Sequence, residues 1–125
     1  MTSLLPDMDP VYLDTELALE QIGDAQAVHG MLTMLEETLQ RDVPRIAELL
    51  EAHDVVAANR LLHPLKGFLP IFCRSELCEH VAQVEMLSKD SHSQSVGPAY
   101  QELMPELNLL LSEVSAYLNE HGAAY

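Results

Sequence analysis

Tryptophan is absent from this 125-residue sequence, and only six residues are phenylalanine or tyrosine. Aliphatic side chains must therefore form most of the core. No apolar run approaches the roughly 20 residues that a membrane-spanning helix needs. The first residues, MTSLLPDMDPVY, lack the basic region and the long apolar segment of a signal peptide. We therefore expect a cytoplasmic protein that does not cross a membrane.

Basic residues are also scarce, because six Lys and Arg stand against 20 Asp and Glu and give a formal net charge of −14. A surface this acidic repels phosphate backbones and anionic lipids. We therefore expect neither nucleic acid nor membrane as a partner. The two cysteines, in a sequence without an export signal, are expected to be reduced thiols.

Signals for β-structure are missing, since no run of four or more residues alternates convincingly between polar and apolar and no Asn-Gly or Asp-Gly turn occurs. Apolar residues instead recur every three or four positions, which predicts amphipathic helices. The expected helices cover residues 14–22, 24–53, 54–69 with a bent apolar end at 70–73, 75–87, and 98–117 after a polar loop at 90–97. One all-α domain follows, an antiparallel bundle of amphipathic helices.

Acidic residues avoid one part of the sequence. None of the 20 Asp and Glu residues falls between Val55 and Ser75, whereas Arg60, Lys66 and Arg74, half of the basic residues, do. His63 lies in the middle of this window. A neighbourhood kept free of negative charge suits a bound anion.

Helical spacing places two further residues on the face of His63. Lys66 and Gly67 follow it by three and four residues, one turn along the helix. Lys66 could neutralise an anion attached to the imidazole, and Gly67 removes a side chain that would screen it. Arg60, three residues before His63, could add a second charge on the other side. Because a neutral imidazole is a competent nucleophile, the pattern suits a phosphoryl group carried on histidine.

The segment HPLKG at 63–67 resembles the H-x-L-K-G signature of histidine-containing phosphotransfer (HPt) domains. Residues 17–54 are similar to the first two helices of that family, and AANRLLHPLKG is similar to its third. VE at 84–85 stands where the family commonly has Leu-Glu or Leu-Gln. The resemblance is strongest over residues 12–90, which leaves residues 1–11 as an N-terminal extension of a single domain spanning 1–125.

The resemblance implies an antiparallel four-helix bundle with a short extra N-terminal helix, and an exposed His63 near the middle of the bundle. It would accept a phosphoryl group from, and donate it to, aspartates of response-regulator receiver domains, with a hybrid sensor histidine kinase as a further possible partner. The five glycines are scattered and form no phosphate-cradling loop for ATP. We expect no cofactor on this chain and expect Mg²⁺ on the partner receiver.

Carried over by position, the family pattern assigns roles to four residues besides His63. Lys66 would neutralise the phosphate, Gly67 would give clearance to the receiver, Glu85 would orient the imidazole, and Lys89 would lie near the phosphate. Glu85 and Lys89 are four residues apart and so face one direction. An acid that holds one ring nitrogen as N–H would leave the other free to react.

The sequence departs from the family in the segment after the glycine. Phe68 and Leu69 stand where small residues are usual, and Cys73 replaces a frequent glycine. Pro64 and Pro70 are unusual inside this helix because each removes a backbone hydrogen bond. These changes concern the docking surface and leave the phosphate residues intact.

Three functions remain: a phosphocarrier, an HPt-like module that binds a receiver or kinase without being phosphorylated, and a plain structural bundle. The intact His63, Lys66 and Gly67 argue against the second, and the acid-free window argues against the third. Metal binding is disfavoured because the C-x4-C spacing of Cys73 and Cys78 is not that of a zinc site. The sequence therefore favours the phosphocarrier.

Overall fold

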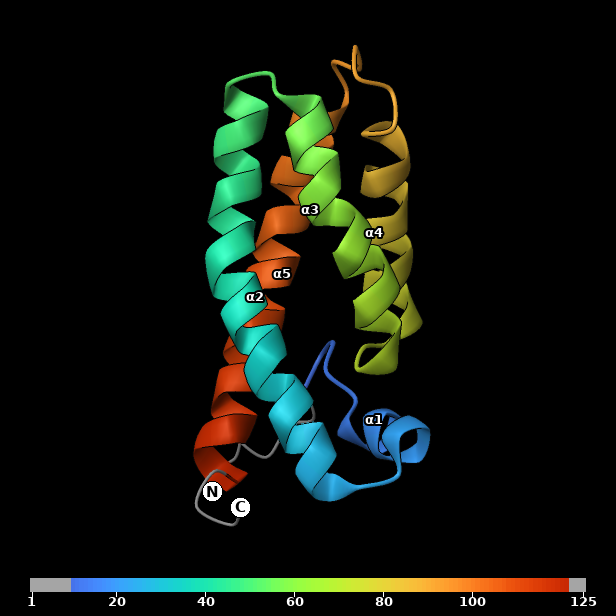
Figure 1. The fold of residues 1–125 in the computed structure, drawn as a ribbon, viewed down its shortest axis with the longest axis vertical. Helices are drawn as coiled ribbons and strands as arrows, with labels where there is room; N and C mark the ends of the chain where they lie inside the picture. The colour runs from blue at the N-terminus through green and yellow to red at the C-terminus, as the bar shows by residue number, and fades with distance from the viewer. Residues whose placement is uncertain (1–9, 122–125) are drawn as a thin grey trace.

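A computed structural model describes residues 10–121, which form five α-helices and one 3-10 turn (Figure 1). The elements are α1 (Thr15–Ile22), α2 (Ala25–Glu51), α3 (Val55–Phe68), the 3-10 turn η1 (Leu69–Ile71), α4 (Ser75–Leu87) and α5 (Val96–His121). Helices α2 to α5 form an antiparallel bundle, and α1 lies at the end opposite the α2–α3 link. The predicted all-α fold is confirmed. Of the expected extension 1–11, residues 1–9 lie outside the described residues.

Local capping sets the starts of the first three helices. Asp14, Asp24 and Asp54 each accept a hydrogen bond from the backbone N–H three residues later, at 3.0 to 3.1 Å. Gly23 ends α1 in the left-handed conformation, with φ of 83°. These predicted boundaries are confirmed.

The fifth helix differs from its prediction. It begins at Val96, so the last two residues of the expected loop 90–97 are helical. A glycine and a proline are tolerated there because the first turn of a helix needs no intrahelical N–H donors. Helices α2 and α5 also continue through Pro44 and Pro105.

The predicted apolar stripes meet in one core between the helices. Its fully buried members come from all four bundle helices, among them Leu35, Leu39, Leu62, Val81, Leu103 and Leu107. Tyr100 of α5 is buried too, and its hydroxyl donates a hydrogen bond of 2.7 Å to the carbonyl of Val43. This bond ties α5 to α2 directly before Pro44.

Residues 10–14, here called the N-terminal strap, run antiparallel beside the turn between η1 and α4. The amide of Asp14 donates to the carbonyl of Phe72 at 2.7 Å, and the amide of Arg74 donates to the carbonyl of Tyr12 at 3.0 Å. The strap thereby covers the corner at which the chain passes from α3 to α4.

Two charged side chains fasten the strap. The carboxylate of Glu113 on α5 accepts the N–H groups of Tyr12 and Leu13, each at 3.0 Å. The guanidinium of Arg74 donates to strap carbonyls, including that of Val11 at 3.1 Å. Arg74, one of the cations in the acid-free window, therefore has a structural role.

Candidate functional site

His63 lies on the outward face of α3. Its neighbours Leu62 and Leu65 are buried in the core, which turns the imidazole away from the bundle axis. The side chain is 70% exposed. Its position between two core residues fixes the backbone beneath it and leaves the ring accessible.

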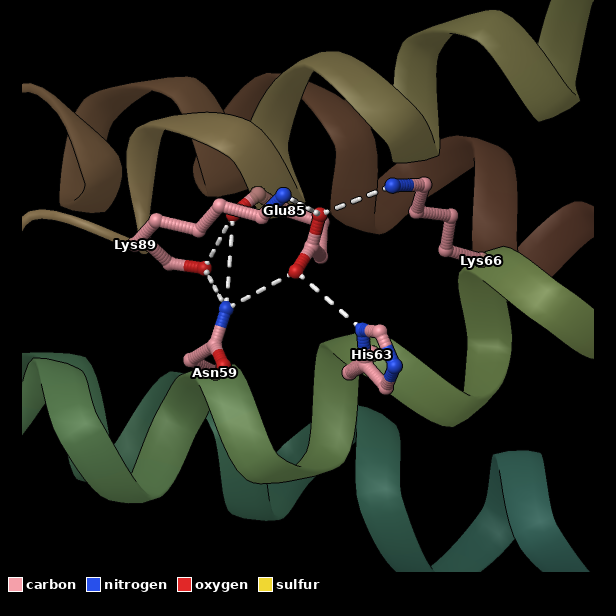
Figure 2. Close-up of polar contacts among 6 residues, drawn as sticks. Asn59, His63, Lys66, Glu85 and Lys89 are labelled. Carbon is pink, nitrogen blue, oxygen red and sulfur yellow. Dashed lines mark hydrogen bonds and ion pairs between the residues drawn. The ribbon is translucent and has the colours of Figure 1, made fainter.

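Glu85 of α4 lies beneath the imidazole, and its side chain is only 1% exposed. Its Oε2 is 3.4 Å from Nδ1 of His63, and its Oε1 is 3.4 Å from Nζ of Lys66 and 4.0 Å from Nζ of Lys89 (Figure 2). Two lysines and one histidine thus surround one buried carboxylate. The structure brings together four of the six residues that the sequence singled out.

Two residues of this site were not predicted from the sequence: Asn59, which donates to the carboxylate, and Ser88, which accepts from Asn59. Asn59 of α3 donates through Nδ2 to Oε2 of Glu85 at 3.1 Å (Figure 2). It also donates to Oγ of Ser88 at 2.8 Å. Ser88 in turn donates to the backbone carbonyl of Glu85 at 2.6 Å. Asn59 lies one turn before His63, so helical spacing could have marked it as a neighbour of the site.

Glu85 is kept ionised by these partners. Burial alone would raise the pKa of Glu85, but hydrogen bonds from Asn59, His63 and Lys66 outweigh burial and hold that pKa below its usual value. The site therefore contains a negative charge at neutral pH, although the acid-free window from Val55 to Ser75 supplies no acidic residue. The charge comes from the neighbouring helix.

An ionised carboxylate can only accept hydrogen bonds, so it favours the tautomer of His63 that carries a proton on Nδ1. The second ring nitrogen, Nε2, points away from Glu85 (Figure 2). In that tautomer Nε2 has a free lone pair on an exposed ring. This arrangement presents a nucleophile to a partner from outside.

Gly67 lies one turn beyond His63 and is exposed. A Cβ placed on it would meet no atom within 4 Å. Helix packing therefore gives no reason for a glycine at this position. Its effect is to leave the surface beside the imidazole bare.

Arg60 is not brought into the Glu85 cluster. Residues three before and three after His63 fall about 60° to either side of it around the helix, so Arg60 and Lys66 diverge. Arg60 instead lines a groove between α2 and α3.

The cysteines offer little nucleophilic or ligating chemistry. Cys73 and Cys78 are free thiols, and burial raises the pKa of both. Each is therefore protonated near neutral pH. Within residues 10–121 no three His, Cys, Asp or Glu side chains converge as a metal site would require.

Comparison with known families shows that the family model described as Hpt domain matches residues 30–117. The matched region runs from within α2 to within α5 and includes every residue of the Glu85 cluster. No curated protein and no solved structure matches the chain. Among the helices of the described region, none is both long and apolar enough to cross a membrane.

Proposed function

The chain belongs to the Hpt domain family, and from this premise we propose that it is a histidine phosphotransfer protein of a His–Asp phosphorelay. Domains of this family act in phosphotransfer in two-component systems and interact with receiver domains and kinases. The observation that carries the proposal is the exposed imidazole of His63 with the ionised Glu85 at its Nδ1. That pairing leaves Nε2 as the acceptor atom.

The proposed step is an in-line transfer between His63 and a receiver aspartyl phosphate. The Nε2 lone pair forms a P–N bond while the P–O bond to the aspartate breaks, and the aspartate carboxylate leaves with that electron pair. The ring then carries a proton on Nδ1 and a phosphoryl group on Nε2, so it is positively charged. The carboxylate of Glu85, 3.4 Å from Nδ1, stabilises this charge. The reverse step returns the phosphoryl group to an aspartate.

Lys66 and Lys89 supply positive charge to the phosphoryl group. Their ammonium groups converge on Oε1 of Glu85 at 3.4 and 4.0 Å, and both side chains are partly exposed. In this proposal either lysine contacts the phosphate on Nε2, because both lie at the carboxylate that also contacts the imidazole. Catalysis of phosphoryl transfer consists mainly of positioning and charge neutralisation, so this small set of groups is sufficient.

The remaining components come from the partners in this proposal. A receiver domain brings the aspartate and its Mg²⁺, and a hybrid sensor histidine kinase is a second candidate partner in the cytoplasm. The chain would accept its phosphoryl group from such a partner and not from ATP.

The test is incubation of the chain with a phosphorylated receiver in Mg²⁺, followed by detection of acid-labile, alkali-stable phosphate. We expect the wild-type chain to become labelled and the His63→Gln variant not to. His92→Gln is the matched control, because His92 is also exposed but lies in the α4–α5 loop. Label retained by folded His63→Gln would refute the assignment. A wild-type chain that binds receivers without becoming labelled would support the interaction-module alternative.

A further inference from the structure

Three of the four arginines of this chain line one groove. The groove lies between α2 and α3 and has a volume of about 480 Å³. Its lining residues are Arg41, Asp42, Arg45, Leu49, Ala57, Arg60 and Leu61. We call it the arginine groove. Half of the six basic residues thus lie on one surface of a chain whose net charge is −14.

The positive groups of the arginine groove face solvent around an apolar floor. Arg41 is paired with the buried Asp42 at 2.8 Å, yet its side chain is 71% exposed. Arg45 forms an ion pair of 3.1 Å with Glu48 in which both side chains are more than half exposed. Arg60 makes neither a hydrogen bond nor an ion pair with any residue of the described part of the chain. At least one guanidinium therefore has its full donor set available for a partner.

The arginine groove adjoins the phosphotransfer site. Arg60 forms part of its wall and lies three residues before His63 on the same helix. Helices α2 and α3 lie side by side (Figure 1). Arg60 and His63 are less than one helical turn apart, so a partner that occupies the groove also lies close to the imidazole. A macromolecule that brings an aspartyl phosphate to His63 would cover this groove as well.

We propose that the arginine groove docks an acidic amphipathic helix of the receiver domain that exchanges phosphate with His63. This inference rests on the proposed function and adds the chemistry of the partner's contact surface. The apolar floor requires apolar side chains, and arginine forks match carboxylates in two-point contacts. The remaining acidic surface of the chain would repel the same helix, so the charge pattern selects both the partner and its orientation.

The test compares two variants that each make the chain more negative by two charges. Arg45→Glu alters the groove at an exposed residue outside the Glu85 cluster, and Gln26→Glu/Asn119→Asp is the control at exposed positions outside the groove. The probe is a phosphorylated receiver, from the same genome, that labels the wild-type chain. At about 0.1 M salt and sub-saturating receiver, we expect Arg45→Glu to transfer about tenfold more slowly and the control within about twofold of wild type.

Three further measurements make the result specific. The difference should shrink at about 1 M salt, where charges are screened over about 3 Å. Labelling of Arg45→Glu by phosphoramidate, a small donor that needs no docking, should match wild type. Replacing a glutamate of the receiver helix by lysine should restore transfer to Arg45→Glu.

The outcomes separate the two proposals. Unchanged receiver transfer by Arg45→Glu, or equal slowing of the control, would overturn the docking inference while leaving His63 as the acceptor. A wild-type chain that takes up phosphate from neither phosphoramidate nor any receiver would refute the proposed function. A salt-sensitive dimer of this chain alone, abolished by Arg45→Glu, would assign the groove to a second copy and overturn the inference.

Discussion

Glu85 and His63 are close in space but opposite in exposure. The carboxylate Oε2 and the imidazole Nδ1 are 3.4 Å apart, while the two side chains are 1% and 70% exposed. The carboxylate accepts a hydrogen bond from Asn59, and the imidazole ring is left in solvent. The bundle thus orients a surface histidine without covering it.

The tautomer of His63 is the first prediction. Nitrogen-15 NMR at a pH where the ring is neutral should show the proton on Nδ1 in the wild-type chain. In Glu85→Gln an amide can donate as well as accept, so the Nε2–H form should become populated. Transfer from a receiver should fall by about 10- to 100-fold, as for other residues that orient a ligating histidine. A wild-type ring protonated on Nε2 would remove the orienting role of Glu85.

Glu85 should also make stability depend on pH. Its pKa in the folded chain lies below the ordinary value of 4.5, so the unfolded chain binds this proton first as the pH falls. The stabilisation by ionised Glu85 is therefore complete above about pH 4.5 and is lost as the pH drops through the folded pKa. Urea unfolding from pH 7 to 3 should show the free-energy gap between wild type and Glu85→Gln closing in acid. A gap that is constant over this range would contradict the depressed pKa.

We expect Asn59 to affect the stability of the fold through its hydrogen bond to Glu85. Asn59→Ala removes donors to a buried carboxylate, so it should raise the pKa of Glu85 and lower the free energy of unfolding by about 1 to 3 kcal/mol. Asn108→Ala is the matched control, because Asn108 is exposed within α5 and the change in helix propensity is the same. Carbon-13 NMR titration of Glu85 reports the pKa. If the two variants unfold alike and Glu85 titrates unchanged, Asn59 is only a solvated side chain.

Gly67 is expected to be a docking glycine. Since its Cβ position is open, Gly67→Ala should raise the free energy of unfolding by up to about 1 kcal/mol. Gly67→Gln should slow labelling by a receiver much more than labelling by phosphoramidate. Gly30, which is exposed in α2 and equally open, supplies the controls Gly30→Ala and Gly30→Gln. An early-melting Gly67→Gln that exchanges phosphate normally would assign the glycine to packing.

The local features of this fold were predictable from sequence. Aspartate caps and apolar stripes act within a few residues, so the starts of α1, α2 and α3 follow from Asp14, Asp24 and Asp54. The start of α5 was not predictable in the same way, because Gly97 and Pro98 occur in loops and in first helical turns alike.

The same distinction holds for the candidate site: contacts within one helix were predictable from sequence, and contacts between helices were not. Lys66 relative to His63, and Lys89 relative to Glu85, are spacings within one helix and could be read directly. The bonds of Asn59 to Glu85 and Ser88 join residues 26 and 29 positions apart, and they depend on the register between α3 and α4. That register is set by core packing, which spacing within a single helix does not specify.

The contacts of the N-terminal strap stabilise this bundle independently of the contacts around His63. Glu113 and Arg74 hold the strap, whereas Glu85 holds the imidazole, and the two groups of bonds share no partner. Free-energy changes at sites without common partners usually add within about 0.5 kcal/mol. Glu113→Gln should therefore lower the melting temperature by the same amount whether position 85 carries Glu or Gln. Substitutions in the strap can therefore accumulate, or be introduced by design, without changing the contacts of His63.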